Sequence, residues 1–225
     1  GEVIARMTVP EDTDIVEAVR YLTENDRFSF PAVHWQMDAN FWNDYHMRDY
    51  AAWVEENYNP GIRSLVRFWV ETMRESSRVL RWYPFIDPMQ DMLFARPSML
   101  RCGCGHANYS IMTDGHIAPC PIMVGMKDYY VGHIRTADPL HLPVTTVGSP
   151  CTECGLLDFC GGRCLYSNIT RPWPEEGRKI VCGTVENLYE ALKAALPEVQ
   201  ALLDAGRVRM KDFEHQKYNS CEIIP

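Results

Sequence analysis

The residues of this chain best suited to chemistry are its cysteines, of which the sequence has nine in 225 residues. One group places Cys102 and Cys104 ahead of Gly115 and Cys120, with ten residues between Cys104 and the glycine. The second group has the spacing C-x2-C-x5-C-x3-C with one cysteine beyond it, and consists of Cys151, Cys154, Cys160, Cys164 and Cys182. A C-x2-C pair lets two thiolates of one loop hold one metal ion or one edge of a cluster. Eight ligands divide into two sets of four, which suits two cubane iron–sulfur clusters.

The spacing alone leaves some alternatives open. Zinc sites built from four cysteines also use C-x2-C pairs, so zinc is the alternative metal. A disulfide framework is disfavoured because disulfide-dense proteins are usually small and poor in core, whereas this chain is 46% hydrophobic. Either Cys102 and Cys104 both bind, or only one does and an iron is left open to substrate. Cys221 we interpret as a spare thiol rather than a ligand.

The composition excludes two classes of partner. The formal net charge is −8 and no long run of Lys or Arg occurs, which argues against nucleic acid as the main partner. No run of about 18 apolar residues occurs, so the sequence predicts no membrane-spanning helix.

Residues 1–100 have the pattern of parallel βα units, in which strands alternate with helices. Three such strands amount to about half of a six- or eight-stranded barrel, so we predict an α/β part that is a partial (βα) barrel. Pro10 is expected at the start of its first helix, and Asn59-Pro60-Gly61 is expected to break the later helical stretch. The predicted strands are 3–9, 31–37 and 79–86, and the predicted helices are 11–25, 45–58 and 62–78.

Residues 101–183 are rich in Cys, Gly and Pro and predict an irregular α+β domain. A short β-hairpin is expected around the turn Thr113-Asp114-Gly115, where Gly115 would supply a positive φ. Residues 184–225 predict a helical segment, with one helix over 185–196 capped by Thr184 and a second opened by Pro197.

Polar side chains alternate along the second predicted strand, at His34, Gln36 and Asp38. Alternate residues of a strand share a face, so in a barrel these three would point into the lumen, toward substrate. A buried structural role is equally compatible with the pattern. The tryptophans of this part are expected in the core rather than at a recognition surface. They are Trp42, Trp53, Trp69 and Trp82.

The cysteine spacing resembles the SPASM domain of radical S-adenosylmethionine enzymes over residues 102–182. That signature is a cysteine, nine to fifteen residues, a glycine, four residues and a cysteine, then C-x2-C-x5-C-x3-C, then a last cysteine. This chain satisfies each term. Gly132-His133-Ile134 resembles the family's Gly-Asn-Ile, and Cys160-Gly161-Gly162-Arg163-Cys164 resembles its Gly-rich final pair of cysteines. Residues 1–100 resemble the second half of the family's barrel.

The resemblance implies interleaved ligands. The cluster nearer the barrel would take Cys120 and Cys164 with Cys102 and Cys104. The distal cluster would take the remaining cysteines of the second group, Cys151, Cys154, Cys160 and Cys182. Arg6 resembles a barrel arginine that helps hold the carboxylate of S-adenosylmethionine, although a surface or salt-bridged arginine fits as well.

Two departures qualify the resemblance. The radical motif C-x3-C-x2-C is absent from the sequence, which leads us to expect a C-terminal fragment whose N-terminal half carries it. Pro121 follows Cys120, where the sulfatase-maturing branch has a catalytic Asp, so the peptide-modifying group is the better analogy.

The function that the resemblance implies is the auxiliary-cluster part of a peptide-modifying oxidoreductase. Its two [4Fe-4S] clusters would take part in electron transfer or substrate binding. Expected partners are a peptide or protein substrate, the missing N-terminal half and an electron-donor protein, in the cytoplasm. The alternative is a zinc- or cluster-stabilised module that binds a peptide or partner without catalysis.

Overall fold

The chain divides into two units, and the computed structural model describes residues 2–25, 27 and 30–218. Within these residues the first unit is formed by 2–96 and 173–215, and the second by 97–172 and 216–218. The first is a mixed α/β unit. The second is mostly irregular and contains every described cysteine except Cys182, which lies in the first.

The sheet of the first unit contains two parallel strands, β1 (Ile4–Val9) and β2 (Ala32–Met37). Their register pairs Ile4 with Ala32 and Val9 with Met37, which confirms the strands predicted over 3–9 and 31–37. The connecting helix α1 (Ile15–Glu24) starts later than predicted, because the Asp14 carboxylate caps it by accepting the N–H groups of Val16 and Glu17. Pro10 therefore lies outside the helix.

The predicted break at Asn59-Pro60-Gly61 is wrong. The chain continues from α2 (Tyr50–Trp53) through one π-helical stretch (Val54–Tyr58) into α3 (Asn59–Ser76). Pro60 stands in the first turn of α3, directly after a π-helical turn. The i→i−4 hydrogen bond that a proline ring would disrupt in an α-helix is not formed across the π-helical turn, so the proline is accommodated. Helical structure thus passes the proline without a loop.

Gly61 is required for packing rather than for a turn. A Cβ at this buried position would overlap Cγ2 of Ile15 on α1. We expect Gly61→Ala to lower the free energy of unfolding by about 1–3 kcal/mol, because the added methyl overpacks the α1–α3 contact. Urea denaturation would measure this. Gly183→Ala is the matched control, since a Cβ there meets nothing within 4 Å; equal stability of the two variants would contradict the packing role.

The predicted third strand over 79–86 is also wrong. This segment meets β2 through a parallel bridge between Trp82 and Val33, and α4 (Tyr83–Leu93) begins at the next residue. Phe85, Ile86 and Met89 are fully buried at helical spacing, and the first turn of the helix holds a proline, which is tolerated there. A short apolar run such as 79–86 fits a buried strand and a buried helix equally well, so its pattern alone does not distinguish them.

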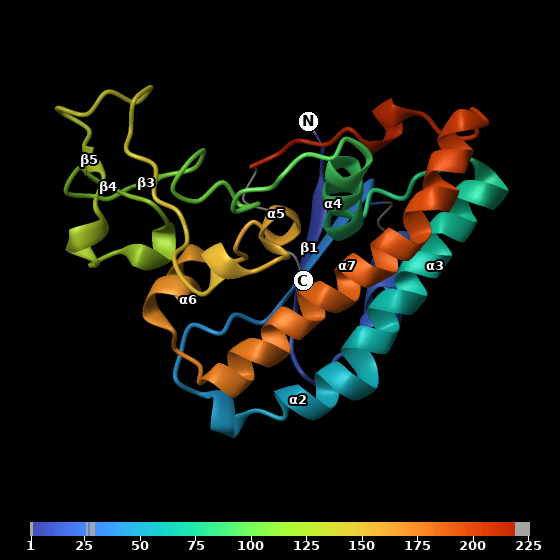
Figure 1. Cartoon of the computed structure of the whole chain (residues 1–225), viewed down its shortest axis with the longest axis horizontal. Helices are drawn as coiled ribbons and strands as arrows, with labels where there is room; N and C mark the ends of the chain where they lie inside the picture. The colour runs from blue at the N-terminus through green and yellow to red at the C-terminus, as the bar shows by residue number, and fades with distance from the viewer. Residues whose placement is uncertain (1, 26, 28–29, 219–225) are drawn as a thin grey trace. The chain divides into compact units, whose positions relative to one another are not determined.

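The last helix is longer than predicted. Helix α7 (Glu175–Asp204) is continuous, and Thr184 is not its cap but a buried residue whose hydroxyl donates to the Val181 carbonyl at 2.8 Å. Pro197 lies inside the helix on its exposed side. Within the first unit α7 lies beside α3 (Figure 1), and Arg74 of α3 pairs with Glu198 of α7 at 3.2 Å. A single-turn 3₁₀ helix (Met210–Phe213) follows α7.

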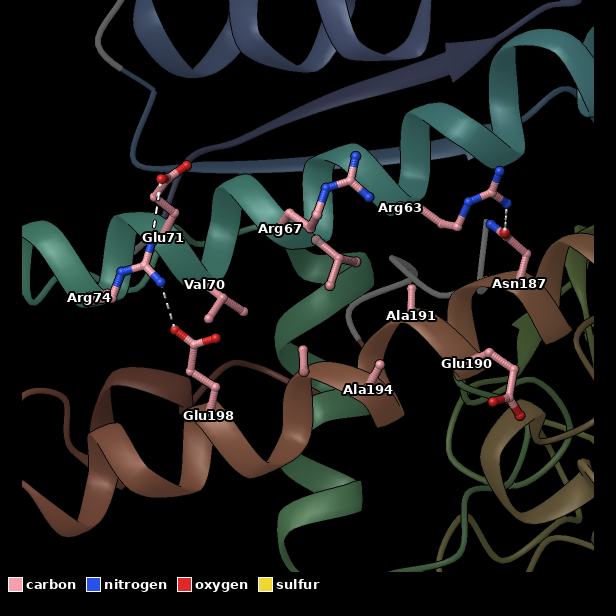
Figure 2. Close-up of a pocket in the computed structure, with 12 residues that line it drawn as sticks. Arg63, Arg67, Val70, Glu71, Arg74, Asn187, Glu190, Ala191, Ala194 and Glu198 are labelled. Carbon is pink, nitrogen blue, oxygen red and sulfur yellow. Dashed lines mark hydrogen bonds and ion pairs between the residues drawn. The ribbon is translucent and has the colours of Figure 1, made fainter.

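A groove of about 870 Å³ runs between α3 and α7 (Figure 2). Its α3 wall carries Arg63, Arg67 and Arg74, and its α7 wall carries Glu190 and Glu198. The arginines at its ends are held by α7, Arg63 by Asn187 and Arg74 by Glu198. No cysteine or histidine is among its lining residues.

The second unit has a small antiparallel sheet of β3 (Ser110–Ile111), β4 (His116–Ala118) and β5 (Gly132–His133), in that order. The predicted hairpin is confirmed: Gly115 has φ 93° in the turn between β3 and β4. Two short helices follow, α5 (Leu157–Cys160) and α6 (Leu165–Thr170). Short 3₁₀ turns complete the described elements, at Tyr45–Met47 in the first unit and at Pro121–Met123, Lys127–Tyr129 and Cys151–Glu153 in the second. None of the helices in the described residues is long and apolar enough to cross a bilayer.

Candidate metal centre

Three cysteines lie against one another in the second unit. The backbone N–H of Cys104 donates to the sulfur of Cys102 at 3.4 Å, and the Cys104 thiol donates to the Pro119 carbonyl at 3.2 Å, next to Cys120. Cys104 is 5% exposed and belongs to the small core of this unit, against which Cys102 and Cys120 pack. The chain therefore gathers the cysteines on both sides of the Gly115 hairpin into one place.

The contact between these thiols shifts the pKa values of Cys104 and Cys120 in opposite directions. Hydrogen bonds with the sulfurs of Cys102 and Cys120, followed by burial, raise the pKa of Cys104. The hydrogen bond from Cys104 lowers the pKa of Cys120 to about 7. Metals bind thiolates rather than thiols. Cys120 can therefore ionise near neutral pH, whereas Cys104 needs a neighbouring positive charge, such as a metal centre, to replace its proton.

Cys164 belongs to the same neighbourhood. It is the N-cap residue of α6, and burial raises its pKa although the backbone and hydroxyl of Ser167 donate hydrogen bonds to its sulfur. The nearby Cys120 adds to the rise. A thiol that feels the charge of Cys120 lies within electrostatic reach of the three thiols described above.

A tight turn separates Cys160 from Cys164. Gly161, Gly162 and Arg163 all have positive φ, at 69°, 88° and 53°. A Cβ at Gly161 would meet the Met99 carbonyl, so only glycine fits there. Three left-handed residues in succession redirect the backbone sharply, so the two cysteines of this C-x3-C pair need not face the same site.

Amide N–H groups are directed at two further sulfurs. The Asn168 side chain donates to Cys151 Sγ at 3.4 Å, and the Leu156 N–H donates to Cys154 Sγ at 3.5 Å. Asn168 is held in place by paired hydrogen bonds to the backbone of Gly148, at 2.8 and 3.1 Å. Asn168 was not among the predicted site residues. Its position one helical turn after Cys164 could have indicated that it lies near the cysteines. Hydrogen bonds to ligand sulfurs tune the reduction potential of a cluster.

Of the last two cysteines, one belongs to the first unit and one lies outside the described residues. Cys182 lies on α7, in the first unit, and is exposed. Its assignment to the distal set stays a prediction. Cys221, which we expect to be a spare thiol, lies outside the described residues.

The donor set fits a thiolate-bound cluster in its chemistry. None of the eight described cysteines is in a disulfide. Among the described residues, no group of three or more His, Cys, Asp or Glu side chains is arranged to hold a metal ion. The Cys104 thiol instead forms hydrogen bonds with the sulfurs of Cys102 and Cys120. Binding a cluster therefore requires these sulfurs to turn away from each other and toward its irons.

The polar residues predicted for the barrel lumen lie on one face of the β1–β2 sheet. Arg6 pairs in register with His34, and Thr8 pairs with Gln36. The ladder extends to Asp38, whose N–H donates to the Val9 carbonyl at 3.0 Å. Burial, together with the Arg6 charge, lowers the pKa of His34 to about 3, so its imidazole is neutral at physiological pH. His34 Nδ1 and Gln36 Oε1 are buried and have no hydrogen-bond partner in the described residues.

An arginine that was not predicted as a site residue organises the loop after β2. Arg48 contacts Asp44 at 2.7 Å, Asp38 at 2.9 Å and Glu11 at 3.7 Å. Asp44 also accepts a hydrogen bond from the indole of Trp173, at 2.8 Å. The spacing Asp44-x3-Arg48 could have indicated the first of these pairs.

Trp42 corrects one expectation about the core. Its side chain is 69% exposed in this loop, whereas Trp53, Trp69 and Trp82 are buried as predicted. The loop between 38 and 49 makes a turn at this point that leaves the indole in solvent, while the neighbouring Asn40 is buried.

Solved structures resemble this fold. No protein-family model and no curated protein matches the sequence. A histidine-tagged form of "anSMEcpe with bound AdoMet" matches with a TM-score of 0.61 and 16% identity, over 92% of this chain. "Native anSMEcpe with bound AdoMet and Kp18Cys peptide" matches with a TM-score of 0.61 and 17% identity, over 91% of this chain. This chain spans 58% and 57% of those chains. At such identity the likeness concerns the fold alone.

Proposed function

We propose that this chain is the auxiliary-cluster part of a radical S-adenosylmethionine enzyme that modifies a ribosomally made peptide or protein. The observation that carries the proposal is the meeting of the Cys102, Cys104 and Cys120 thiols, with Cys164 within electrostatic reach. Cysteines that come together without forming a disulfide are typical of metal ligands. The fold-level likeness to such enzymes supports the same class.

The eight cysteines would hold two [4Fe-4S] clusters. Cys102, Cys104, Cys120 and Cys164 form the set that the resemblance assigns to the cluster nearer the barrel. Interleaved sets tie segments distant in sequence together, so cluster binding also supplies folding free energy to a unit with little regular structure. The distal set consists of Cys151, Cys154, Cys160 and Cys182.

When bound, such clusters accept or donate single electrons, or bind substrate at an open iron. The protein's own contribution is to hold the sulfurs and to set their environment. Asn168 and the Leu156 N–H donate to ligand sulfurs on the distal set. These hydrogen bonds lower the electron density on the sulfurs and favour the reduced form.

The polar sheet face is the proposed substrate and cofactor side. Arg6 would hold the carboxylate of S-adenosylmethionine in the full-length enzyme, and His34, Gln36 and Asp38 would line the lumen. The radical-initiating motif would come from an N-terminal half, and an electron-donor protein would reduce it. One neighbouring structure was solved with a peptide, which supports a peptide substrate.

Metal analysis tests this proposal. Iron, acid-labile sulfide and zinc would be measured in chain purified and reconstituted without oxygen. About eight irons and eight sulfides per chain are expected for two cubanes. One or two zinc ions with no uptake of iron would overturn the redox role and favour a zinc-stabilised binding module.

A further inference from the structure

The groove between α3 and α7 has two walls of opposite charge (Figure 2). On the α3 side the charged lining residues are three arginines and one glutamate, Arg63, Arg67, Arg74 and Glu71. On the α7 side they are two glutamates, Glu190 and Glu198. The α3 wall is therefore basic and the α7 wall is acidic, and a partner that enters the groove must present the opposite charge to each wall.

The floor of the groove is apolar. Val66 and Val70 of α3 are 3% and 4% exposed. The apolar lining residues of α7 are small, namely Ala191, Ala194 and Ala195. Short side chains leave room for a further helix to approach α7 closely, because the distance between packed helices depends on the side chains at the contact. An apolar centre enclosed by charged residues is the usual composition of a protein–protein interface.

Two charged residues in the middle of the groove are available to a partner. Arg67 is exposed, and it has no hydrogen bond or ion pair within the described part of the chain. Glu190 pairs with Lys193 of its own helix at 3.8 Å, and both side chains are more than half exposed. Exposed ion pairs contribute little to stability. Both Arg67 and Glu190 can therefore pair with another molecule at little cost to the fold.

The two available charges stand at the same level of the groove. Helices α3 and α7 run parallel and in register, because the contacts at both ends of the groove join residues 124 positions apart in the sequence. The same interval places Arg67 at the level of Ala191, with Glu190 beside it. A two-fold axis parallel to these helices would turn a second copy over while keeping every residue at its level. The Arg67 side of each copy would then face the Glu190 side of the other.

We propose that this groove is an interface between two copies of this chain, in which α7 of each copy lies in the groove of the other. Arg67 of one copy pairs with Glu190 of the second, and symmetry forms the same pair twice. The alanines of the two α7 helices meet over the apolar floor. A second copy is the occupant that the charges favour, because a surface with one basic and one acidic wall is complementary to itself. This inference goes beyond the proposed function and does not depend on the clusters.

Sedimentation velocity of the purified chain over a series of concentrations would test the proposal. The unaltered chain is expected to form a dimer that dissociates on dilution and weakens as salt rises, because salt screens the pairs at the rim. Arg67→Glu and Glu190→Arg should each weaken the dimer at least about tenfold, since like charges then face each other twice. The double variant Arg67→Glu/Glu190→Arg restores opposite charges, and its dissociation constant should return to within about threefold of the original.

A variant of the floor and two controls complete the experiment. Ala194 is exposed, so Ala194→Trp should block the groove without disturbing the fold, and it is expected to prevent association. Arg20→Glu on α1 and Glu75→Arg on α3 reverse exposed charges outside the groove lining and should leave association unchanged. A chain that stays monomeric at every concentration would overturn the proposal and leave the groove to a different protein. A dimer that ignores the single reversals, or that the double variant does not restore, would overturn it as well.

Discussion

Replacing Cys164 and Cys160 together by alanine is expected to remove both iron–sulfur clusters, whereas replacing Cys164 and Cys120 together should remove only one. Each single variant should leave about four irons of the expected eight, because a cluster that loses one of its four thiolates is not retained. Cys120 and Cys164 belong to one set in our proposal. Once Cys164→Ala has removed that cluster, adding Cys120→Ala should remove no further iron. Effects of residues that act on one site are non-additive, and effects on separate sites add.

This double-variant comparison tests the interleaving itself. Cys160 and Cys164 are four residues apart, yet the turn through Gly161, Gly162 and Arg163 separates them. Cys120 and Cys164 are distant in sequence, yet Cys120 adds to the rise that burial produces in the pKa of Cys164. Iron and sulfide content, with electron paramagnetic resonance of the reduced protein to count cluster signals, would measure the outcome. Cys221→Ala is the control and should keep full iron content.

Two results would contradict the assignment. If Cys160→Ala/Cys164→Ala keeps the same iron as Cys164→Ala alone, neighbouring cysteines share a cluster and the sets are not interleaved. If Cys120→Ala/Cys164→Ala loses all iron, the two residues serve different clusters. Far-ultraviolet circular dichroism would show whether the first unit, in which Cys182 on α7 is the one proposed ligand among the described residues, remains folded in each variant.

Patterns of local sequence predicted the first two strands and the hairpin well. Alternation along 31–37 and the turn residues at 113–115 gave β2 and the β3–β4 hairpin, because both signals depend on neighbours within a few residues. Gly61 and Thr184 were misinterpreted for the opposite reason. Gly61 is glycine because Ile15 packs against it from α1, and Thr184 satisfies its hydroxyl inside a helix that continues. Tertiary contacts of this kind leave no trace in a local pattern.

The candidate site came from the resemblance of the cysteine spacing to the SPASM signature, which implies a common site for Cys102, Cys104 and Cys120. Their thiols lie in contact, and their role as ligands stays a prediction. The Asn168 contact to Cys151 and the Trp173 contact to Asp44 join residues 17 and 129 positions apart. Exposure of Trp42 depends on the course of a whole loop. None of these three could have been read from neighbouring residues.

Removing Arg48 is expected to destabilise the first unit strongly. Its side chain is 13% exposed and contacts three carboxylates, which would be left to repel one another in Arg48→Ala. Breaking a buried ion pair by removing one partner costs about 3–5 kcal/mol, and the partial exposure here lowers the expectation to about 2–4 kcal/mol. Urea denaturation followed by tryptophan fluorescence would measure the free energy of unfolding. Arg20→Ala, which removes an exposed pair with Glu24, should cost less than about 1 kcal/mol.

The pH dependence of the stability that Arg48→Ala loses identifies the cause of that loss. Burial acts to raise the pKa of Asp44, but hydrogen bonds from Trp173 and Arg48 outweigh it and hold the pKa below 3.8. A carboxyl whose folded pKa is lowered stabilises the fold above its unfolded pKa, and this contribution is lost as pH falls through the folded pKa. The stability gap between the unaltered chain and Arg48→Ala should therefore be full at pH 7 and narrow below about pH 4. A gap that stays constant to pH 3 would assign the loss instead to packing, since the Arg48 guanidinium lies 5.5 Å from the Trp173 ring centroid.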